Sequence, residues 1–445
     1  MEETRRNFIK KVAAGSSALA IGGVGFGFSA ESYSRIMGAS DRIIVGVMGT
    51  NGRGKSMAAN FATRENTIVR TICDVEDKAL QKGISAVEQA VGKSPKSEKD
   101  IRRMLEDKKI DAVFLAPPDH WHAPATIMSC VAGKHVYVEK PLSHSPAEGE
   151  MAIQAAKKYN RVVQMGAQRR SWKLLTEGIA ELKNGAIGNA YMAKTWYTNN
   201  RGPIGTGNVV PVPSNLDYDL WQGPAPRRPY RDNLIHYNWH WFWNWGTGEA
   251  LNNGTHEVDL ARWGLGVDFP TRVHSVGGRY HYQDDWEAFD TQLITYECDK
   301  ASVIWEGRSC NGTKVEGLDR GVIFYGDKGS MLTGHDGYTI YDMDENIVKE
   351  VKSDVVIDGR NTASPAASLD NVHIDNFLQC IRTGATLNAD VETGHKSTTW
   401  VQLGNIAQRV GRGLVIDPKT GHITGDEEAQ ALWGREYEPG WEPEF

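Results

Sequence analysis

The chain has few cysteines, and their arrangement excludes two classes of site. The five cysteines are odd in number and far apart, and no Cys-x-x-Cys pair occurs. Neither a zinc knuckle nor a disulfide framework is therefore supported. His120 and His122 form a His-x-His pair, but nothing near them in the sequence completes a ligand set. We expect no metal.

The chain also lacks a strong excess of charge of one sign. Its formal net charge is −6, from 50 Lys and Arg against 56 Asp and Glu, and the basic residues are scattered. This excludes the clustered basic surface of a nucleic-acid-binding protein and a polybasic membrane patch. With 445 residues, the chain is long enough for two ordinary domains. We expect a small-molecule partner.

Long hydrophobic runs are missing as well, apart from one at the N-terminus. Arg5 and Arg6 precede an apolar, glycine-containing run over residues 12–28, which looks like a twin-arginine export signal. The run is short and glycine-rich for a membrane span of about 20 residues. We therefore expect a signal and linker over residues 1–40 and export to the periplasm. An uncleaved anchor and a chance basic start are the alternatives.

Short apolar strands alternate with helical segments over residues 41–165. Strands are predicted at 42–48 (RIIVGVM), 67–73, 112–115 and 135–138, with helices at 77–91, 97–107 and from Pro124. This alternation predicts an α/β domain with a doubly wound parallel sheet.

Residues 166–445 follow a different pattern. Longer alternating strands are predicted at 191–197, 272–282, 291–298, 302–308 and 321–325, which favours an antiparallel or mixed sheet. Residues 198–233 hold six prolines and four glycines, as expected for a lid, an oligomer arm or a binding loop. Amphipathic helices are predicted at 372–383 and 396–410. We expect a second α/β domain that binds substrate and forms oligomers.

Residues 49–56 (GTNGRGKS) satisfy two motifs at once. They match the phosphate loop of triphosphatases, and they resemble a dinucleotide fingerprint in which Asn51 replaces a glycine. A dinucleotide site needs an acidic residue about 20 residues on, at the end of the next strand, and Asp74 meets that demand. Glu139, which ends a later apolar strand, could serve the triphosphatase instead. We favour a pyrophosphate loop, with Asn51 tolerating an unusual backbone. Its residues would be Gly49, Thr50, Asn51, Gly52, Arg53 and Gly54.

Three further stretches carry a family resemblance. They are PPDHWH at 117–122, Glu-Lys-Pro at 139–141 and GEALNNGTHEVD at 248–259. Together with the glycine loop they resemble the glucose–fructose oxidoreductase/inositol dehydrogenase family, Gfo/Idh/MocA, from residue 41 to about residue 416. The resemblance implies a Rossmann domain and a larger α/β domain with an open sheet, with the active site between them.

The resemblance implies roles for three residues. Lys140, held by a cis Lys140–Pro141 bond, would donate a proton to a substrate oxygen or stabilise it by charge. His256 and Asn252 lie four apart on a predicted helix and share one face. A neutral imidazole is a suitable base for a sugar hydroxyl. Many family members carry Asp where Asn252 stands, which puts simple alcohol dehydrogenation in doubt.

Further contacts follow from the same resemblance. Arg170 would contact the substrate from the strand end at 166–170. The cofactor side would be formed by Pro118, Asp119, His122, Glu139, Lys140 and Gln168.

An aromatic segment follows the irregular stretch. YNWHWFWNW at 237–245 places four tryptophans at alternate positions, which on an extended chain would face one way. A flat ring suits the C–H face of a pyranose, although core packing or an interface would use the same stripe. We expect Trp241 and Trp243 to contact substrate.

The function predicted from these features is NAD(P)-dependent hydride transfer to or from a carbohydrate or polyol. NAD is favoured over NADP because Asp74, Glu76 and Asp77 would repel a 2′-phosphate. Outside the cytoplasm no nicotinamide pool reoxidises the cofactor, so a redox-neutral reaction is the first alternative. It would pair oxidation and reduction of two sugars, or cleave a glycoside by oxidation, elimination and reduction. A non-catalytic sugar-binding protein is the second alternative. The family implies a homodimer or homotetramer through the second sheet.

Overall fold

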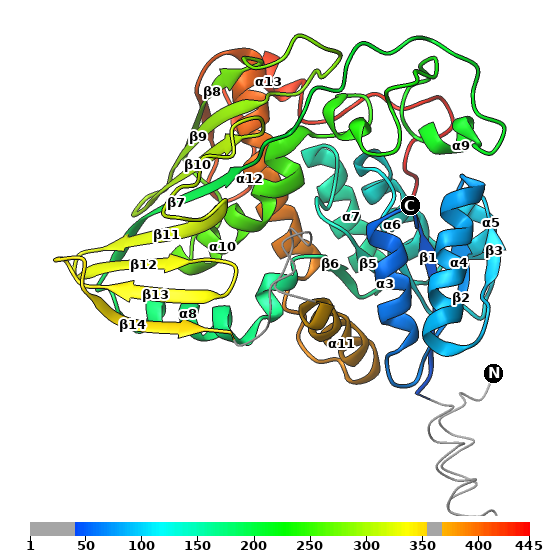
Figure 1. Cartoon of the computed structure of the whole chain (residues 1–445), viewed down its shortest axis with the longest axis horizontal. Coiled ribbons are helices and arrows are strands. Elements are labelled where there is room, and N and C mark those ends of the chain that lie inside the picture. The colour runs from blue at the N-terminus through cyan, green and yellow to red at the C-terminus, as the bar shows by residue number, and fades with distance from the viewer. Residues whose placement is uncertain (1–40, 354–366) are drawn as a thin grey trace, which may run out of the picture. The chain divides into compact units, whose positions relative to one another are not determined.

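The computed structural model describes residues 41–353 and 367–445. The expected export signal lies outside these residues. No helix within the described ranges is long and apolar enough to cross a membrane. Residues from Ile43 onward belong to one unit, which contains both sheets (Figure 1).

The first sheet has six parallel strands in the order β3-β2-β1-β4-β5-β6. Since the strand order reverses at β1, the carboxyl ends of β1 and β4 border the crevice where such sheets bind ligands. The predicted doubly wound sheet is confirmed. Its strands are β1 (Ile43–Met48), β2 (Thr67–Cys73), β3 (Lys96–Glu98), β4 (Ala112–Leu115), β5 (His135–Val138) and β6 (Val163–Met165).

Helices cover both faces of this sheet and bury its strands. One core joins the sheet to α3 (Arg53–Ala62), α4 (Asp77–Val91) and α11 (Ala367–Thr383). The opposite core joins it to α5 (Ile101–Glu106), α6 (His122–Val131) and α7 (Pro146–Lys158). Helix α11 comes from far along the chain, yet Phe377 lies against Phe61 and Tyr137.

The prediction of a single helix over residues 97–107 is wrong. Its first part is strand β3, and α5 begins only after Asp100. The side chain of Asp100 caps α5 by accepting a hydrogen bond from the Arg102 backbone N–H at 2.9 Å. An N-cap aspartate starts a helix at its own position, so the preceding residues were free to join the sheet.

The second sheet has ten strands in the order β14-β13-β12-β11-β7-β10-β9-β8-β15-β16. Among the strands that the structure describes in this sheet, only the β7–β10 pair is parallel, so the predicted mixed sheet is confirmed. The sequence analysis did not identify β12 to β16. The strands are β7 (Ala190–Thr198), β8 (Arg272–Gly278), β9 (Thr291–Glu297), β10 (Ser302–Arg308), β11 (Arg320–Gly326), β12 (Gly329–Thr333), β13 (Gly337–Tyr341), β14 (Ile347–Lys352), β15 (Leu414–Ile416) and β16 (Ile423–Thr424).

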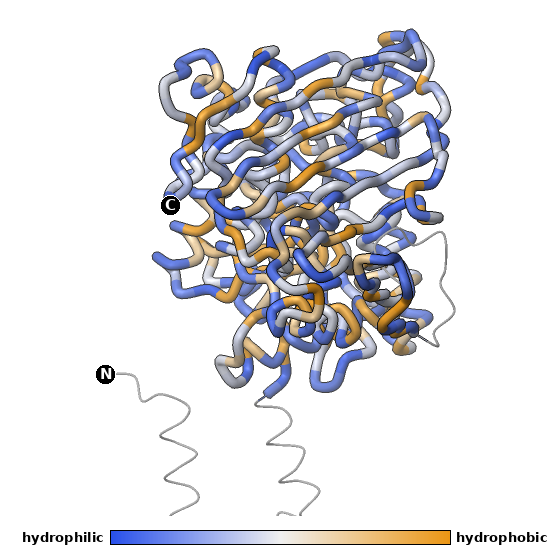
Figure 2. The backbone as a smooth tube through the Cα atoms, turned by 90° about the vertical axis from the view of Figure 1, so that its left-hand side faces the viewer, coloured by the Kyte–Doolittle hydropathy of each residue, from blue (hydrophilic) through white to orange (hydrophobic). Residues whose placement is uncertain are grey.

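Helices cover one face of this sheet. The core beneath it includes α8 (Lys173–Lys183), α10 (Thr255–Leu265) and α12 (Val391–Val410). The other face is turned to the viewer in Figure 2, where hydrophilic and hydrophobic colours alternate along the strands. Val276, Leu293 and Val415 are exposed there. Helix α12 contacts both α7 and β8, and so joins the two sheets' layers.

The helix predicted to hold Asn252 and His256 is present but begins irregularly. Ala250–Gly254 forms a π-helical turn that continues into α10. Gly254 packs closely on Trp305, since an added Cβ would lie 2.9 Å from that indole. Such turns are rare and occur frequently at functional sites. Asn252 therefore lies in the widened turn and His256 in the regular one.

Candidate active site

The glycine loop between β1 and α3 is built around two close contacts. Gly49 has φ +82°, a conformation that favours glycine, and a Cβ added to Gly54 would lie 1.7 Å from the Gly49 carbonyl oxygen. No side chain caps the first N–H groups of α3. These donors are therefore available to an anion such as a pyrophosphate.

Asn51 does not adopt the left-handed backbone that its residue type allows. That conformation is taken by Gly49, whereas Asn51 has no positive φ. The Asn51 side-chain oxygen instead accepts a hydrogen bond from Lys82 Nζ at 2.6 Å. Asn51, which replaces a glycine of the dinucleotide fingerprint, is thus linked to α4 through Lys82.

Asp74 ends β2, the strand directly beside β1. Its Oδ2 accepts a hydrogen bond from the Thr50 backbone N–H at 2.7 Å, and its Oδ1 accepts one from Glu76 N–H at 3.0 Å. Burial raises the pKa of this carboxyl. A carboxylate offers about four acceptor positions, so Asp74 retains capacity for ribose hydroxyls. The loop, the helix end and Asp74 together fit a dinucleotide.

Arg53 is engaged with protein carboxylates. Its Nε lies 2.8 Å from Glu139 Oε1, and its two terminal nitrogens bind Asp370 of α11 at 2.6 and 2.7 Å. In the orientation in which the Gln168 amide nitrogen donates to the Gly166 carbonyl at 2.8 Å, its oxygen accepts from Arg53. Three residues predicted to bind the cofactor, Arg53, Glu139 and Gln168, therefore form one cluster.

Lys140 follows β5, at the carboxyl edge of the parallel sheet. Its Nζ donates to the backbone carbonyl oxygen of Asn252 at 2.5 Å and lies 3.3 Å from the Asn252 side-chain oxygen. Burial lowers the pKa of Lys140, against the opposing effect of Glu139 and Asp119. The Lys140–Pro141 bond is cis, as the resemblance predicted. Segments 112 residues apart are thus brought together.

His256 is nearly buried, with 4% of its surface exposed. Within the described part of the chain, burial and nearby charges act on its ring, with no hydrogen bond among the causes of its pKa shift. Burial, followed by the nearby cations Lys140, Arg169 and Arg320, lowers the pKa of His256 well below 6.5. The imidazole is therefore neutral at physiological pH.

A buried network of charged side chains lies beside this pair, and the sequence analysis missed most of it. Glu257 lies between Arg169 at 2.9 Å and Arg320 at 3.1 Å. Asn253 links Arg320, at 2.8 Å, to Glu249, which pairs with Arg201. The partners come from separate strands, helices and loops, so no local pattern reveals them. Apart from Arg201, each residue of the network is less than 9% exposed.

The residues of the 117–122 stretch brace the loops around Lys140. Asp119 accepts a hydrogen bond from the Thr247 hydroxyl. The ring nitrogens of His122 face the carbonyl oxygens of Pro141 at 2.5 Å and Pro117 at 2.9 Å. Pro118 precedes the short helix Asp119–Trp121. His120 likewise faces two carbonyl oxygens, and burial lowers its pKa to about 3.

Arg170, in the short helix Gln168–Ser171, is taken up by an ion pair. Its guanidinium makes three contacts of 2.8 to 3.0 Å with the Asp259 carboxylate and lies over the Trp263 ring. Arg170 thus links its short helix to α10, and its predicted substrate contact stays a prediction.

The expectation that residues 237–245 are extended is wrong. Asn238–Trp241 forms a 3-10 helix, so the four tryptophans do not share one face. Trp241 is buried and stacks on Trp286 at 4.0 Å, whereas Trp243 is half-buried beside Phe289. A short helix, α9 (Tyr218–Gln222), packs nearby through Trp221 and Trp245. The packing of these indole rings on one another, and not the alternation of tryptophans along the sequence, sets the direction of each side chain. Tyr237 of the same segment accepts a hydrogen bond at its hydroxyl from Asn252 Nδ2 at 3.2 Å. The substrate contacts of Trp241 and Trp243 stay predictions.

Two family models match the chain over nearly all of the described residues. "Oxidoreductase family, NAD-binding Rossmann fold" matches residues 43–167. "Oxidoreductase family, C-terminal alpha/beta domain" matches residues 189–442, more than half of the chain.

Individual relatives fall into two groups. Myo-inositol 2-dehydrogenase of Thermotoga maritima is 28% identical over 295 residues, 65% of this chain and 74% of the relative. A glycosyl hydrolase family 109 protein of Saccharopolyspora erythraea is 29% identical over 152 residues, 31% of this chain and 33% of the relative. The structure of scyllo-inositol dehydrogenase from Lactobacillus casei matches with a TM-score of 0.62 at 18% identity, over 84% of this chain and 99% of that one.

Proposed function

The chain belongs to the Gfo/Idh/MocA oxidoreductase family, and on that premise we propose that it transfers hydride between NAD and a carbohydrate or polyol. The observation that carries this proposal is the meeting of Lys140, Asn252 and His256 at the carboxyl edge of the NAD-binding sheet. The dehydrogenase among the relatives supports the substrate class.

Each side chain has a distinct task in this reaction. The bound nicotinamide supplies hydride-accepting or hydride-donating chemistry. Lys140 presents an ammonium whose lowered pKa makes it a readier proton donor, and it stabilises negative charge on the substrate oxygen. His256, held neutral by burial, accepts a hydroxyl proton during oxidation and returns it during reduction.

NAD is the proposed cofactor in preference to NADP. Asp74, which accepts from the Thr50 N–H of the glycine loop, would bind the ribose hydroxyls. The Glu76 carboxylate lies two residues on, caps α4 and accepts from Asn215 at 2.9 Å. These two carboxylates would repel a 2′-phosphate. Titration with each dinucleotide should show tighter binding of NAD, and equal affinity would contradict the proposal.

Glycoside cleavage without net redox change is the second candidate. The Asn252 amide stands beside Lys140, and no carboxylate is hydrogen-bonded to His256 among the described residues. Lys140 and His256 therefore lack the carboxylate that many family members carry at the position of Asn252. The glycosyl hydrolase relative supports this candidate over about a third of its own length.

One experiment distinguishes these functions. The purified protein is denatured with acid, the released nucleotide is identified, and the native protein is incubated with polyols, aldoses and aryl glycosides. Reduced nicotinamide in proportion to product supports the dehydrogenase, whereas aglycone release without it supports the glycosidase. Binding without turnover supports the sugar-binding alternative.

The residue assignment has its own test. Lys140→Met and His256→Gln should each lower turnover by about 100-fold or more while NAD still binds. Unchanged turnover would contradict the assigned roles. Exposed Lys55, on the outside of α3, gives the matched control Lys55→Met.

We also propose export through the twin-arginine pathway, supported by the sequence of residues 1–28. Replacing Arg5 and Arg6 together by lysine should retain the protein in the cytoplasm. Unchanged location would contradict export by this route.

A further inference from the structure

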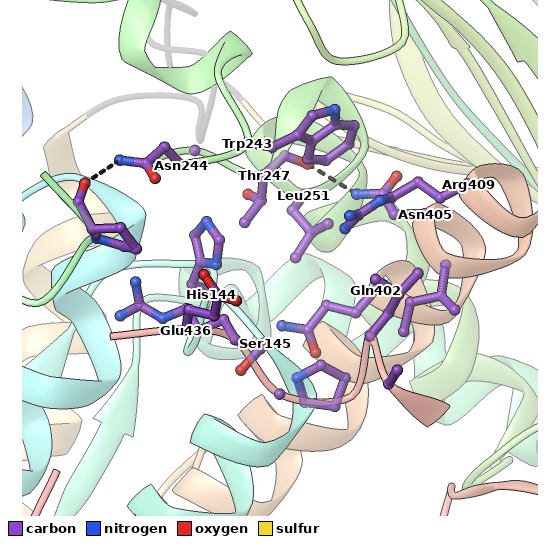
Figure 3. A pocket seen from close by; sticks show the side chains of 18 of the residues that line it. His144, Ser145, Trp243, Asn244, Thr247, Leu251, Gln402, Asn405, Arg409 and Glu436 are labelled. Atoms are coloured by element: carbon purple, nitrogen blue, oxygen red, sulfur yellow. Dashed lines mark hydrogen bonds between the residues drawn. The ribbon is translucent and has the colours of Figure 1, made fainter. Parts of the chain in front are cut away.

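A cavity of about 650 Å³ lies apart from the catalytic pair. It is bounded by the start of α7, one side of α12, residues 243–251 and residues 431–436 of the C-terminal segment (Figure 3). Lys140, Asn252, His256 and the glycine loop do not line it. Its volume is within the range of about 300–1,000 Å³ found for small-molecule sites.

Four residues of the cavity wall have a buried polar atom without a hydrogen-bond partner within the described residues: His144 (Nε2), Ser145 (Oγ), Gln402 (Oε1) and Arg435 (Nη1). The hydroxyl of Ser145 and the imidazole of His144 can each donate or accept, whereas the atoms of Gln402 and Arg435 have fixed and opposite character. Gln402, 3% exposed, donates from Nε2 to the Ser143 carbonyl oxygen at 3.0 Å, which fixes the orientation of the amide. Its Oε1 is buried and accepts no hydrogen bond. Arg435 binds Glu148 and the His120 carbonyl oxygen, but its buried Nη1 donates none.

An unmatched acceptor and an unmatched donor in one cavity restrict the chemistry of a ligand. Inorganic phosphate, which mainly accepts, would satisfy Arg435 and leave Gln402 unmatched. Hydroxyl groups both donate and accept, so a polyhydroxylated ligand satisfies both. A buried polar group without a partner has lost its hydration without compensation, so a ligand that matches both groups gains affinity from each.

Two asparagines and a tryptophan of the cavity wall also suit a polyhydroxylated ligand. Asn405 and Asn244 hold their amides in place by donating to the Thr247 and Pro226 carbonyl oxygens at 2.9 and 3.0 Å, and both amides border the cavity. Trp243 adds a half-buried indole, and Figure 3 shows it across the cavity from His144. Planar amides and an aromatic ring suit the polar edge and the C–H face of a sugar.

Charge favours an acidic ligand. Three arginines, Arg228, Arg409 and Arg435, line the cavity against one acidic residue, Glu436. Arg435 is paired with Glu148, and Arg228 lies 3.5 Å from Glu287. Arg409 has no acidic partner among the described residues and lies over the Trp243 ring at the rim. A carboxylate on the ligand would pair with Arg409.

We propose that this cavity is a second saccharide site that binds a sugar unit bearing a carboxylate, of the uronate class. The site goes beyond the proposed oxidoreductase function and does not depend on it. It is joined to the catalytic pair through the backbone, since Leu251 of its wall precedes Asn252 and His144 follows Lys140 by four residues.

The test uses the full-length protein and isothermal titration with D-glucuronate, D-glucose and inorganic phosphate. Gln402→Leu should weaken glucuronate binding about tenfold, because Gln402 Oε1 can no longer accept a hydrogen bond from a ligand hydroxyl. Arg409→Gln should weaken glucuronate but not glucose. Gln408→Leu and Arg412→Gln, on or just beyond α12 and outside the cavity, are matched controls that should leave binding unchanged.

Lys140→Met separates the cavity from the catalytic site. Glucuronate binding that is unchanged in Lys140→Met and about tenfold weaker in Gln402→Leu supports the proposal. The converse pattern places the probe in the catalytic site and overturns it. Phosphate that binds as tightly as glucuronate, or the absence of saturable binding, also overturns it.

Folding of each variant is checked by thermal unfolding. Gln402→Glu, which keeps the side-chain shape, serves in the same titration if the leucine variant does not fold. It should exclude glucuronate through like charge. NAD release and turnover involve none of the cavity residues, so failure of the proposed function is visible separately.

Discussion

Lys140 Nζ donates a hydrogen bond to the backbone carbonyl oxygen of Asn252 at 2.5 Å, with the side-chain oxygen of Asn252 3.3 Å away. The ammonium therefore faces an amide where a carboxylate would raise its pKa. Burial lowers the pKa of Lys140 below its ordinary value of 10.5. If Lys140 must be protonated for turnover, activity is lost as pH rises through this lowered pKa.

Asn252→Asp should move that loss of activity to higher pH. A carboxylate beside the ammonium favours its charged form and raises the pKa of Lys140 by about one unit or more. The measurement is the pH profile of kcat, with Asn252→Ala as the uncharged control. A basic limb at the same pH in Asn252→Asp and the wild type would show that Lys140 is not the titrating group.

Gly54→Ala should abolish dinucleotide binding, because its Cβ would lie 1.7 Å from the Gly49 carbonyl oxygen. Lys55→Ala, one residue on and exposed, should leave it unchanged. Gly202→Ala is a matched glycine control, since its added Cβ meets no atom within 4 Å. Nucleotide binding is measured by titration. Loss of all binding in Lys55→Ala would favour a triphosphate loop.

Asp370→Asn should destabilise the fold by about 1.5–3 kcal/mol, the range for hydrogen bonds to charged groups. It breaks the two-pronged contact that ties α11 to Arg53 at the start of α3. Asp375→Asn, on the same helix, removes the exposed ion pair in which Asp375 Oδ2 lies 3.5 Å from Arg64 Nη1. This variant should lower the free energy of unfolding by less than about 1 kcal/mol. Urea unfolding measures both, and equal effects would contradict the prediction.

Stability should fall as the protein is acidified below the ordinary histidine pKa. Burial lowers the pKa of His135, His373 and His395 from 6.5 to about 4, and that of His120 to about 3. The unfolded chain therefore binds these protons first. Their contribution is complete above pH 6.5 and is lost progressively as pH falls from 6.5 toward 4.

The free energy of unfolding across this pH range checks the acid effect. His135→Gln should reduce its slope, whereas replacement of the exposed His281 by glutamine should not. A free energy independent of pH between 6.5 and 4 would contradict the burial of neutral imidazoles.

Local pattern was sufficient for the elements of the site. Alternating apolar strands and helices indicated the parallel sheet, and the interval from Gly54 to Asp74 placed an acid on the strand beside the glycine loop. Family motifs supplied Lys140, its cis peptide bond and the helix of Asn252 and His256. These features depend on residues close in sequence or on motifs fixed in order, which a single chain displays.

Tertiary structure alone decided which partners the long charged side chains bind. Arg53 belongs to the predicted pyrophosphate loop, yet its guanidinium binds Asp370, 317 residues away. Arg170 is likewise held by Asp259, and the tryptophan stripe is broken by the stacking of Trp241 on Trp286. The sequence by itself determined the Rossmann fold and predicted which residues meet at the carboxyl edge of its sheet. Partners far apart along the chain set charge pairing, indole packing and the cavity wall, because buried charges and rings are stabilised by whichever groups the completed fold places beside them.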